Sequence, residues 1–280
     1  VVANGHILVG DYKNVLHALD VNTGSELWKF EGAGGRYIAS PLVLDSTILA
    51  PNGDGNLYAL DLNGNLLWKF ETKRGLWSQP VSDGKMIYIS SMDHQLYALS
   101  LTGDLAWSVE LGGSLVYPPT QSPDGVLYVT TIAHKLFSID SSNGNILWEK
   151  GFDKGLWSQP AYHDEVLYIG DMNGSVYALS AADGANQWVH NLGQEAVKEV
   201  VTGQPIIIAD GVVVTTENGT VAAISFAGER LWTHVLSANL YTSPVIVGEN
   251  LAIGLTKGDN FLILLNQNGQ NVWSFTPSKD

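Results

Sequence analysis

The sequence predicts an all-β protein built from seven four-stranded antiparallel sheets. Three observations support this fold class: a repeat of about forty residues, apolar residues that alternate with a period of two, and Asn-Gly or Asp-Gly pairs at recurrent joints. A repeat of this length is typical of chains built from one supersecondary unit copied many times. No stretch shows the 3.6-residue apolar period of an amphipathic helix.

Seven tryptophans mark the repeat, separated by 40, 39, 41, 40, 44 and 41 residues. They are Trp28, Trp68, Trp107, Trp148, Trp188, Trp232 and Trp273. Each follows, after a short turn, a segment such as Leu57-Tyr58-Ala59-Leu60-Asp61. A position that recurs in every unit has a structural role, so we predict that these seven rings are buried where neighbouring sheets meet.

Residues 37–71 show the elements of one unit in order. Strands are expected at 38–44, 47–50, 57–62 and 66–70, separated by Asp45-Ser46, by residues 52–55 and by Asn63-Gly64. Asn-Gly and Asp-Gly pairs favour tight hairpins because both central residues of a type I′ turn have positive φ. At the end of the third strand, Asp20, Asp61 and Asp140 are expected to accept hydrogen bonds from nearby backbone N–H groups.

Seven such sheets arranged radially form a β-propeller, and we predict a single domain over 1–280. A proline precedes the innermost strand of six units (Pro41, Pro80, Pro119, Pro160, Pro205 and Pro244). Val1 aligns with the residue after such a proline, so the start of the first innermost strand is expected to be absent. Either residues were trimmed from an end, which the lack of an initial Met also indicates, or residues 276–280 complete the first sheet.

The repeat resembles that of the PQQ-like, quinoprotein-type β-propeller family. The resemblance rests on Tyr-Ala-Leu-Asp followed by a turn Gly and then Trp, which residues 14–28 and 56–68 match closely, and it covers essentially the whole chain. It implies that Gly64, Trp68 and their equivalents dock between neighbouring sheets. The family includes quinoprotein dehydrogenases and the non-enzymatic BamB-like branch, so the motif is specific for the fold and much less so for function.

Composition excludes several classes of function. The chain has 28 acidic and 14 basic residues and a net charge of -14, which is unfavourable for binding nucleic acid. It has no cysteine, so it has neither a disulfide nor a thiolate metal site. No apolar run approaches the roughly 20 residues that a membrane-spanning helix needs.

No catalytic or metal-binding motif is recognisable. The seven histidines share no metal-ligand spacing, and there is no Gly-x-Ser-x-Gly nucleophile elbow. Residues 52–56 (Asn-Gly-Asp-Gly-Asn) are a weak match to a calcium loop, and a hairpin turn is the favoured interpretation. We therefore predict no enzyme activity, no metal and no cofactor; PQQ with calcium is the alternative that the resemblance implies.

The residues outside the repeat pattern point to a binding surface. Trp77 and Trp157 lie three residues before a proline, where another unit has Tyr241, and Gln79, Gln159 and Gln204 follow two residues later. The preceding connections carry five of the 14 cations: Arg36, Lys73, Arg74, Lys154 and Lys198. The predicted binding residues at this channel mouth are Arg36, Tyr37, Trp77, Gln79, Tyr117, Trp157, Gln159, Lys198, Gln204 and Tyr241. Packing of Trp77 and Trp157 between sheets is the structural alternative.

These features favour a non-catalytic binding or scaffold propeller that presents its loops to another protein. The connection from Trp188 to Pro205 is the longest, and its polar segment 194–199 is expected to take part in docking. A PQQ-binding enzyme and a ligand-sensing module of a larger surface protein are the alternatives. The resemblance, the lack of cysteine and the low charged fraction of 15% indicate a periplasmic or cell-surface location, and a monomer is expected.

Overall fold

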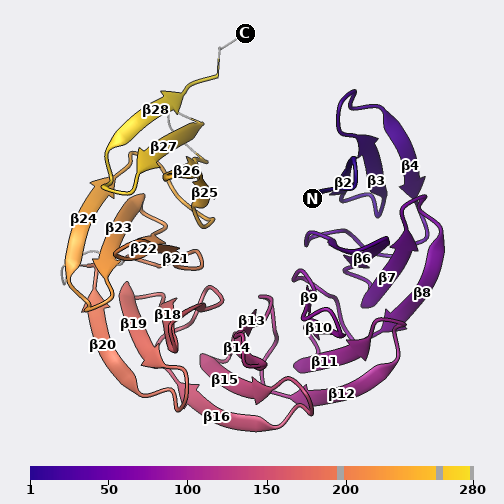
Figure 1. Ribbon diagram of the computed structural model, residues 1–280, viewed down its shortest axis with the longest axis horizontal. Coiled ribbons are helices and arrows are strands. Elements are labelled where there is room, and N and C mark those ends of the chain that lie inside the picture. Colours follow the sequence, from indigo (N-terminus) through magenta and orange to yellow (C-terminus); the bar gives the residue numbers. More distant parts are fainter. Residues whose placement is uncertain (194–198, 257–260, 278–280) are drawn as a thin grey trace. The chain divides into compact units, whose positions relative to one another are not determined.

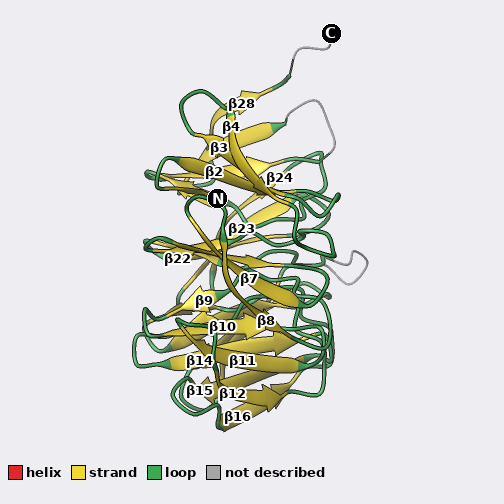
Figure 2. Cartoon of the chain, turned by 90° about the vertical axis from the view of Figure 1, so that its right-hand side faces the viewer, coloured by secondary structure: helices red, strands yellow, loops and turns green. Residues whose placement is uncertain are grey.

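In the computed structural model the chain is all β, as predicted (Figure 1). The structure describes residues 1–193, 199–256 and 261–277, and no helix occurs in these ranges (Figure 2). Seven sheets each contain four strands that follow one another along the chain and pair with their sequence neighbours. The fold class predicted from the repeat is therefore confirmed at the level of its sheets.

The first three sheets have the following strands. Sheet one contains β1 (Val2–Ala3), β2 (His6–Gly10), β3 (Leu16–Asp20) and β4 (Glu26–Phe30). Sheet two contains β5 (Leu42–Leu44), β6 (Thr47–Pro51), β7 (Asn56–Asp61) and β8 (Leu66–Glu71). Sheet three contains β9 (Val81–Ser82), β10 (Met86–Ser90), β11 (Gln95–Ser100) and β12 (Leu105–Glu110).

The remaining four sheets repeat this order. Sheet four contains β13 (Thr120–Gln121), β14 (Val126–Thr131), β15 (Lys135–Asp140) and β16 (Ile146–Gly151), and sheet five β17 (Ala161–His163), β18 (Val166–Gly170), β19 (Ser175–Ser180) and β20 (Asn186–Asn191). Sheet six contains β21 (Ile206–Ile208), β22 (Gly211–Thr215), β23 (Thr220–Ser225) and β24 (Arg230–Val235). Sheet seven contains β25 (Val245–Val247), β26 (Asn250–Gly254), β27 (Leu262–Asn266) and β28 (Asn271–Phe275).

The chain divides into two compact units. The first unit comprises residues 1–133 and 139–147, which include sheets one to three, and the second comprises residues 134–138 and 148–280, which include sheets five to seven. The boundary falls within sheet four. The prediction of a single domain over 1–280 stays a prediction.

Prolines set the start of the innermost strands. Each of β5, β9, β13, β17, β21 and β25 begins at the residue after a proline. This is the expected position because proline has no N–H to donate to a strand partner. Sheet one also has four strands, and its β1 is as short as β9 and β13. Residues 276–277 belong to no strand, and 278–280 lie outside the described residues.

The core of each unit lies between adjacent sheets. In the first unit, Leu8 and Ala18 of sheet one pack with Ile48 and Leu60 of sheet two. The opposite face of sheet two packs against Ile87, Ile89 and Leu99 of sheet three. Since both faces of β6 and β7 are covered, their central residues are buried without alternation, whereas β8 alternates between exposed and half-buried residues. The second unit has two equivalent clusters.

Candidate functional site

Six of the repeat tryptophans lie against a turn glycine of the next sheet. The pairs are Trp28 with Gly64, Trp68 with Gly103, Trp107 with Gly144, Trp148 with Gly184, Trp188 with Gly228 and Trp232 with Gly269. A Cβ added at any of these glycines would lie 2.5–3.0 Å from the indole ring. The indole N–H of Trp28 also donates to the carbonyl oxygen of Leu62 at 2.8 Å. These rings therefore have a packing role.

The exposure of the seven rings differs. Trp273 is 45% exposed, and the other six residues are half-buried rather than fully buried. The predicted burial of Trp273 between neighbouring sheets stays a prediction. For Trp273, no glycine of a following sheet is present within the described residues of its unit.

The strand-end aspartates cap their own turns, as predicted. Asp61 accepts hydrogen bonds from the backbone N–H groups of Asn63 and Asn65, both at 2.8 Å. The side-chain and backbone hydrogen bonds from Asn65 hold the pKa of Asp61 below its usual value. Asp20 and Asp140 make equivalent contacts within their turns and also have a lowered pKa. Their carboxylates are used for structure.

The segments that join one sheet to the next alternate between buried and exposed residues. Four residues before each proline the side chain is buried in every sheet from two to seven (Tyr37, Leu76, Leu115, Leu156, Val201 and Leu240). Tyr37 was predicted as a binding residue, and this prediction was wrong. Its side chain packs against Gly10, where an added Cβ would lie 2.2 Å from the Tyr37 Cβ. Burial raises the pKa of Tyr37, which confirms a core environment.

The next residue of each joining segment is exposed where it is aromatic. Trp77 is 45% exposed, Trp157 is 51% exposed and Tyr241 is 50% exposed. The alternative that Trp77 and Trp157 are buried between sheets is therefore excluded. Thr202 at the equivalent position is buried and donates to the carbonyl oxygen of Leu240 at 2.9 Å.

The three predicted glutamines connect neighbouring sheets. Gln79 donates through Nε2 to the carbonyl oxygen of Pro41 at 2.9 Å, and Gln204 donates in the same way to Pro160 at 3.0 Å. Gln159 donates to Oε1 of Gln204 at 2.8 Å. These amides hold the starts of neighbouring innermost strands together, so their Nε2 groups have a structural use.

The remaining predicted residues differ in their surroundings. Tyr117 is half-buried, and burial raises its pKa to about 12. Arg36 is exposed, and its guanidinium lies 5.5 Å from the centre of the Tyr12 ring. Tyr12 was not predicted as a site residue, although it stands at the tip of the β2–β3 hairpin and is highly exposed. Lys198 and residues 194–197 of the long connection lie outside the described residues.

In the first unit, one hairpin and two joining segments lie side by side. On one flank the β6–β7 turn (52–56) donates a backbone hydrogen bond, from Gly53 N to Arg36 O at 3.0 Å. On the other flank it accepts one, from Leu76 N to Asn52 O at 3.0 Å. Asp54 accepts hydrogen bonds from Gly34 N and from the Tyr58 hydroxyl, both at 2.7 Å. The oxygens of Asp54 are thus used within the loop, which explains the 52–56 sequence as a hairpin and not as a calcium loop.

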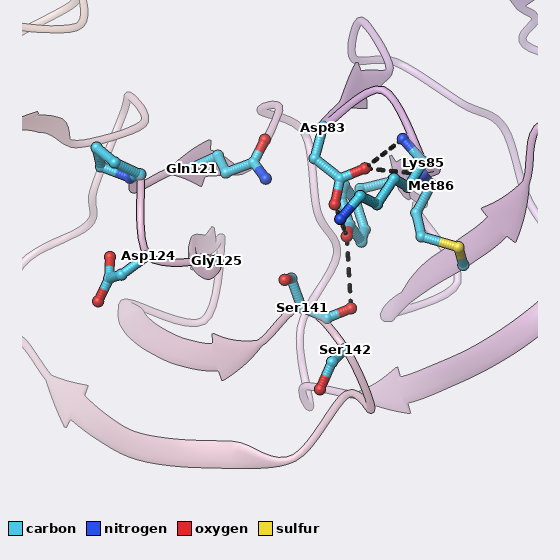
Figure 3. A pocket seen from close by; sticks show the side chains of 10 residues that line it. Asp83, Lys85, Met86, Gln121, Asp124, Gly125, Ser141 and Ser142 are labelled. Atoms are coloured by element: carbon cyan, nitrogen blue, oxygen red, sulfur yellow. Dashed lines mark hydrogen bonds between the residues drawn. The ribbon is translucent and has the colours of Figure 1, made fainter.

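At the opposite end of the first unit, a groove of about 590 Å³ lies beside the β9–β10, β13–β14 and β15–β16 turns (Figure 3). Asp83 lies in its wall and accepts hydrogen bonds from Lys85 N and Met86 N, while the Tyr88 hydroxyl reaches Asp83 at 3.0 Å. These contacts stabilise the turn. Within the described residues of the chain, no three His, Asp or Glu side chains are grouped to hold a metal.

Comparison with known proteins gives a consistent result. The family model described as outer membrane protein assembly factor BamB matches residues 1–75 and 53–274. Outer membrane protein assembly factor BamB of Legionella pneumophila is 25% identical over 231 residues, covering 82% of this chain and 50% of that protein. Quinoprotein ethanol dehydrogenase of Pseudomonas aeruginosa is 28% identical over 97 residues, covering 31% of this chain and 16% of the enzyme. The chain spans about half the length of the BamB relatives that it matches.

A solved structure supports the same fold. The crystal structure of BamB from Moraxella catarrhalis superimposes with a TM-score of 0.75 at 21% identity, covering 90% of this chain and 76% of that one. This likeness confirms the predicted seven-bladed β-propeller class. The described residues include no helix that is long and apolar enough to cross a membrane. Since the family model matches nearly all of the sequence, the chain belongs to the family of outer membrane protein assembly factor BamB.

Proposed function

We propose that this protein is a non-catalytic scaffold of the bacterial cell envelope that binds another protein. Binding would use the connection end of each unit, defined here as the segments joining one sheet to the next together with the turns between the second and third strands of each sheet. Membership of the BamB family supports a role in outer membrane protein assembly. It also supports a location on the periplasmic side of the envelope or at the cell surface.

The observation that carries the proposal is the exposure of Trp77 and Trp157 at equivalent positions of two sheets. A half-exposed indole leaves a large apolar area in water, and Trp is among the residues most enriched at the energetic centre of protein interfaces. Neither ring takes part in the tryptophan–glycine packing of the repeat. The partial exposure of Tyr241 adds a third aromatic side chain at the same position of another sheet.

We propose that the protein has no catalytic activity because several of its polar side chains make structural hydrogen bonds. Asp61 and Asp83 cap turns, Asp54 holds a loop, and the glutamines link innermost strands. Within the described residues no three His, Asp or Glu side chains are grouped, and we assign no step to a calcium–quinone cofactor.

Site-specific photo-crosslinking in the native envelope tests the proposal. A photoreactive amino acid replaces Trp77 or Trp157, and in the control strains it replaces Asp61 or Asp140 in the turns at the opposite ends of the sheets. We expect the same protein to be crosslinked from both tryptophan positions and from neither control position. Crosslinks confined to the control positions, or none from any position, would refute docking at the connection end.

A further inference from the structure

Charge is distributed unequally between the two ends of the first unit. Seven aspartates lie at one end, either in the turns between first and second strands and between third and fourth strands or at the last strand residue before such a turn. They are Asp20, Asp45, Asp61, Asp83, Asp104, Asp124 and Asp140. Lys85 is the single Lys or Arg residue in these turns, all of which lie in described residues. At the connection end, Arg36, Lys73 and Arg74 are exposed, and none of the three forms an ion pair among the described residues. Lys85 at the other end is also exposed and forms no ion pair among the described residues, so the two ends differ in the number of such cations and not in their presence. The connection end also carries Asp11, Asp54 and Asp93 in its turns.

Backbone hydrogen bonds hold these three cations around one loop. Gly53 N donates to Arg36 O at 3.0 Å on one flank of the β6–β7 turn. On the other flank, Thr72 N donates to Gly55 O at 2.8 Å, immediately before Lys73 and Arg74. We call residues 34–38, 52–56 and 72–77 the glycine platform. Its flanks carry the three cations, and Trp77 stands at its end.

Five glycines bring the three segments of the platform close together. They are Gly34, Gly35, Gly53, Gly55 and Gly75, and their backbones are closely packed. A Cβ at Gly35 would lie 2.4 Å from Asp54 N, and one at Gly75 would lie 2.9 Å from Gly53 O. These glycines are required by the close approach of the three segments.

Asp54, the acidic residue within the platform, does not prevent an anion from binding at the flanks of the platform. Asp54 accepts hydrogen bonds from Gly34 N, Asn56 N and the Tyr58 hydroxyl, so donors within the loop stabilise its charge. Arg36 is held over the exposed Tyr12 ring, which leaves the guanidinium N–H groups available for a carboxylate. A second carboxylate lies beside the platform, where Asp93 accepts from Lys73 N at 2.9 Å and also from Gln95 N and the Tyr97 hydroxyl. Three cations against these two carboxylates leave the platform with a small positive charge on a protein whose net charge is -14, which favours an acidic partner at this place.

We propose that the glycine platform binds an extended acidic segment of a partner protein, with carboxylates on Arg36, Lys73 and Arg74 and an apolar side chain on Trp77. This inference rests on the proposed function and specifies the partner chemistry for the connection end of the first unit. Arg–carboxylate hydrogen bonds supply orientation, and the indole supplies desolvated apolar contact. The cations attract an acidic segment and repel a basic one, so charge sign determines selectivity.

Peptide binding by fluorescence polarisation tests this inference. The probe is a dye-labelled 12-residue peptide in which Asp or Glu alternates with Phe or Leu, and the comparison peptide has Lys at every acidic position. The full chain is compared with the triple variant Arg36→Gln, Lys73→Gln, Arg74→Gln. The matched control is Lys69→Gln, Lys85→Gln, Arg230→Gln, which changes the net charge equally at exposed cations outside the platform.

We expect the acidic peptide to bind, with affinity falling as NaCl rises from 50 to 300 mM because salt screens exposed charges. The platform variant should weaken binding about tenfold, and the control variant less than twofold. No binding of the acidic peptide, equal binding of the lysine peptide, or equal effects of the two triple variants would overturn the inference. So would a dimer, detected by sedimentation, that the platform variant alone abolishes, since the platform would then bind a second copy.

The crosslinking experiment at Trp77 and Trp157 separates this inference from the proposed function. If the partner is still crosslinked while the platform variant has no effect on peptide binding, the connection end is an interface and the acidic-segment inference fails. If the acidic peptide binds as expected while no partner is crosslinked in the envelope, the platform chemistry stands and the proposed function fails.

Discussion

At the residue scale, a turn glycine that packs against a repeat tryptophan cannot carry a side chain for two separate reasons, its positive φ and the nearby ring. Gly64 has a φ of +82°, a conformation that L-residues with a side chain rarely adopt, and the ring of Trp28 occupies the position that its Cβ would take. Gly84 has the same φ of +82° but no atom within 4 Å of an added Cβ. The two positions therefore separate backbone strain from steric contact with the indole.

Replacement of each by alanine should show this difference. Gly84→Ala is expected to destabilise the protein by about 1–2 kcal/mol through the left-handed conformation alone. Gly64→Ala adds a collision with the indole ring and should cost at least about 1 kcal/mol more. Chemical denaturation of the two variants measures the difference in the free energy of unfolding. Equal losses would show that the ring does not rest on Gly64.

Asp54 provides a prediction on pH. Partial burial by itself raises the pKa of Asp54, but hydrogen bonds from Tyr58, Asn56 and Gly34 outweigh burial and hold the pKa below the ordinary value of 3.8. A carboxyl with a lowered folded-state pKa stabilises the fold above its unfolded-state pKa. That stabilisation is lost as pH falls through the folded-state value.

Stability should therefore fall below about pH 4, and Asp54→Asn should reduce the difference in unfolding free energy between pH 7 and pH 3. Asp45→Asn is the control, because the described residues make no hydrogen bond to the Asp45 carboxylate. Urea denaturation at the two pH values provides the measurement. A pH dependence that is the same in wild type and in Asp54→Asn would contradict the role given to the Asp54 hydrogen bonds.

At the element scale, hairpins and innermost strands followed local sequence closely. Asn63-Gly64 and Asp83-Gly84 form turns at the predicted positions, but only the glycine of each pair has a positive φ, so neither pair has the two positive φ angles of a type I′ turn. Each of the six prolines lies one residue before an innermost strand. Tyr37 was wrongly predicted as a binding residue because buried and exposed side chains alternate along the joining segment. It lies one residue before Ile38, so its side chain faces the core. Only the packing of neighbouring sheets identifies which face that is.

The glycine platform illustrates what sequence could not reveal. The 52–56 string predicts a turn, but the neighbours of that turn come from residues 34–38 and 72–77, which are brought together by inter-sheet hydrogen bonds. Likewise, the hydrogen bond from Gln79 Nε2 to the Pro41 carbonyl oxygen joins residues that are distant along the chain. Contacts of this kind depend on how the sheets pack, and local propensity does not encode them.

The fourth strand of each sheet should depend on its tryptophan. Trp28→Ala removes a ring that packs on Gly64 and an indole N–H that donates to Leu62 O at 2.8 Å. We expect a loss of about 3 kcal/mol in the free energy of unfolding. Trp77→Ala, at a half-exposed ring, is the matched control and should cost less than about 1 kcal/mol. Similar losses in the two variants would contradict the division between structural and binding tryptophans.

At the scale of the whole molecule, the repeat separates structure from recognition. Residues that recur in the sheets, such as Trp28 and Asp61, hold the fold, whereas Trp77 and Trp157 depart from the repeat and are exposed. This division agrees with membership of the BamB family. Under the proposed function, binding uses the exposed residues of the connection end.

The most direct test uses the partner protein that crosslinking identifies. It measures the affinity of that partner for the double variant Trp77→Ala, Trp157→Ala. Its control is Leu27→Ala, Leu147→Ala, which removes two similarly exposed apolar side chains from the fourth strands of two sheets. We predict that the tryptophan variant binds at least about tenfold more weakly with an unchanged unfolding midpoint, as loss of interface anchors requires, and that the leucine control binds normally. Unchanged affinity of the tryptophan variant, or an equal loss in the leucine control, would contradict the assignment of the connection end as the binding surface.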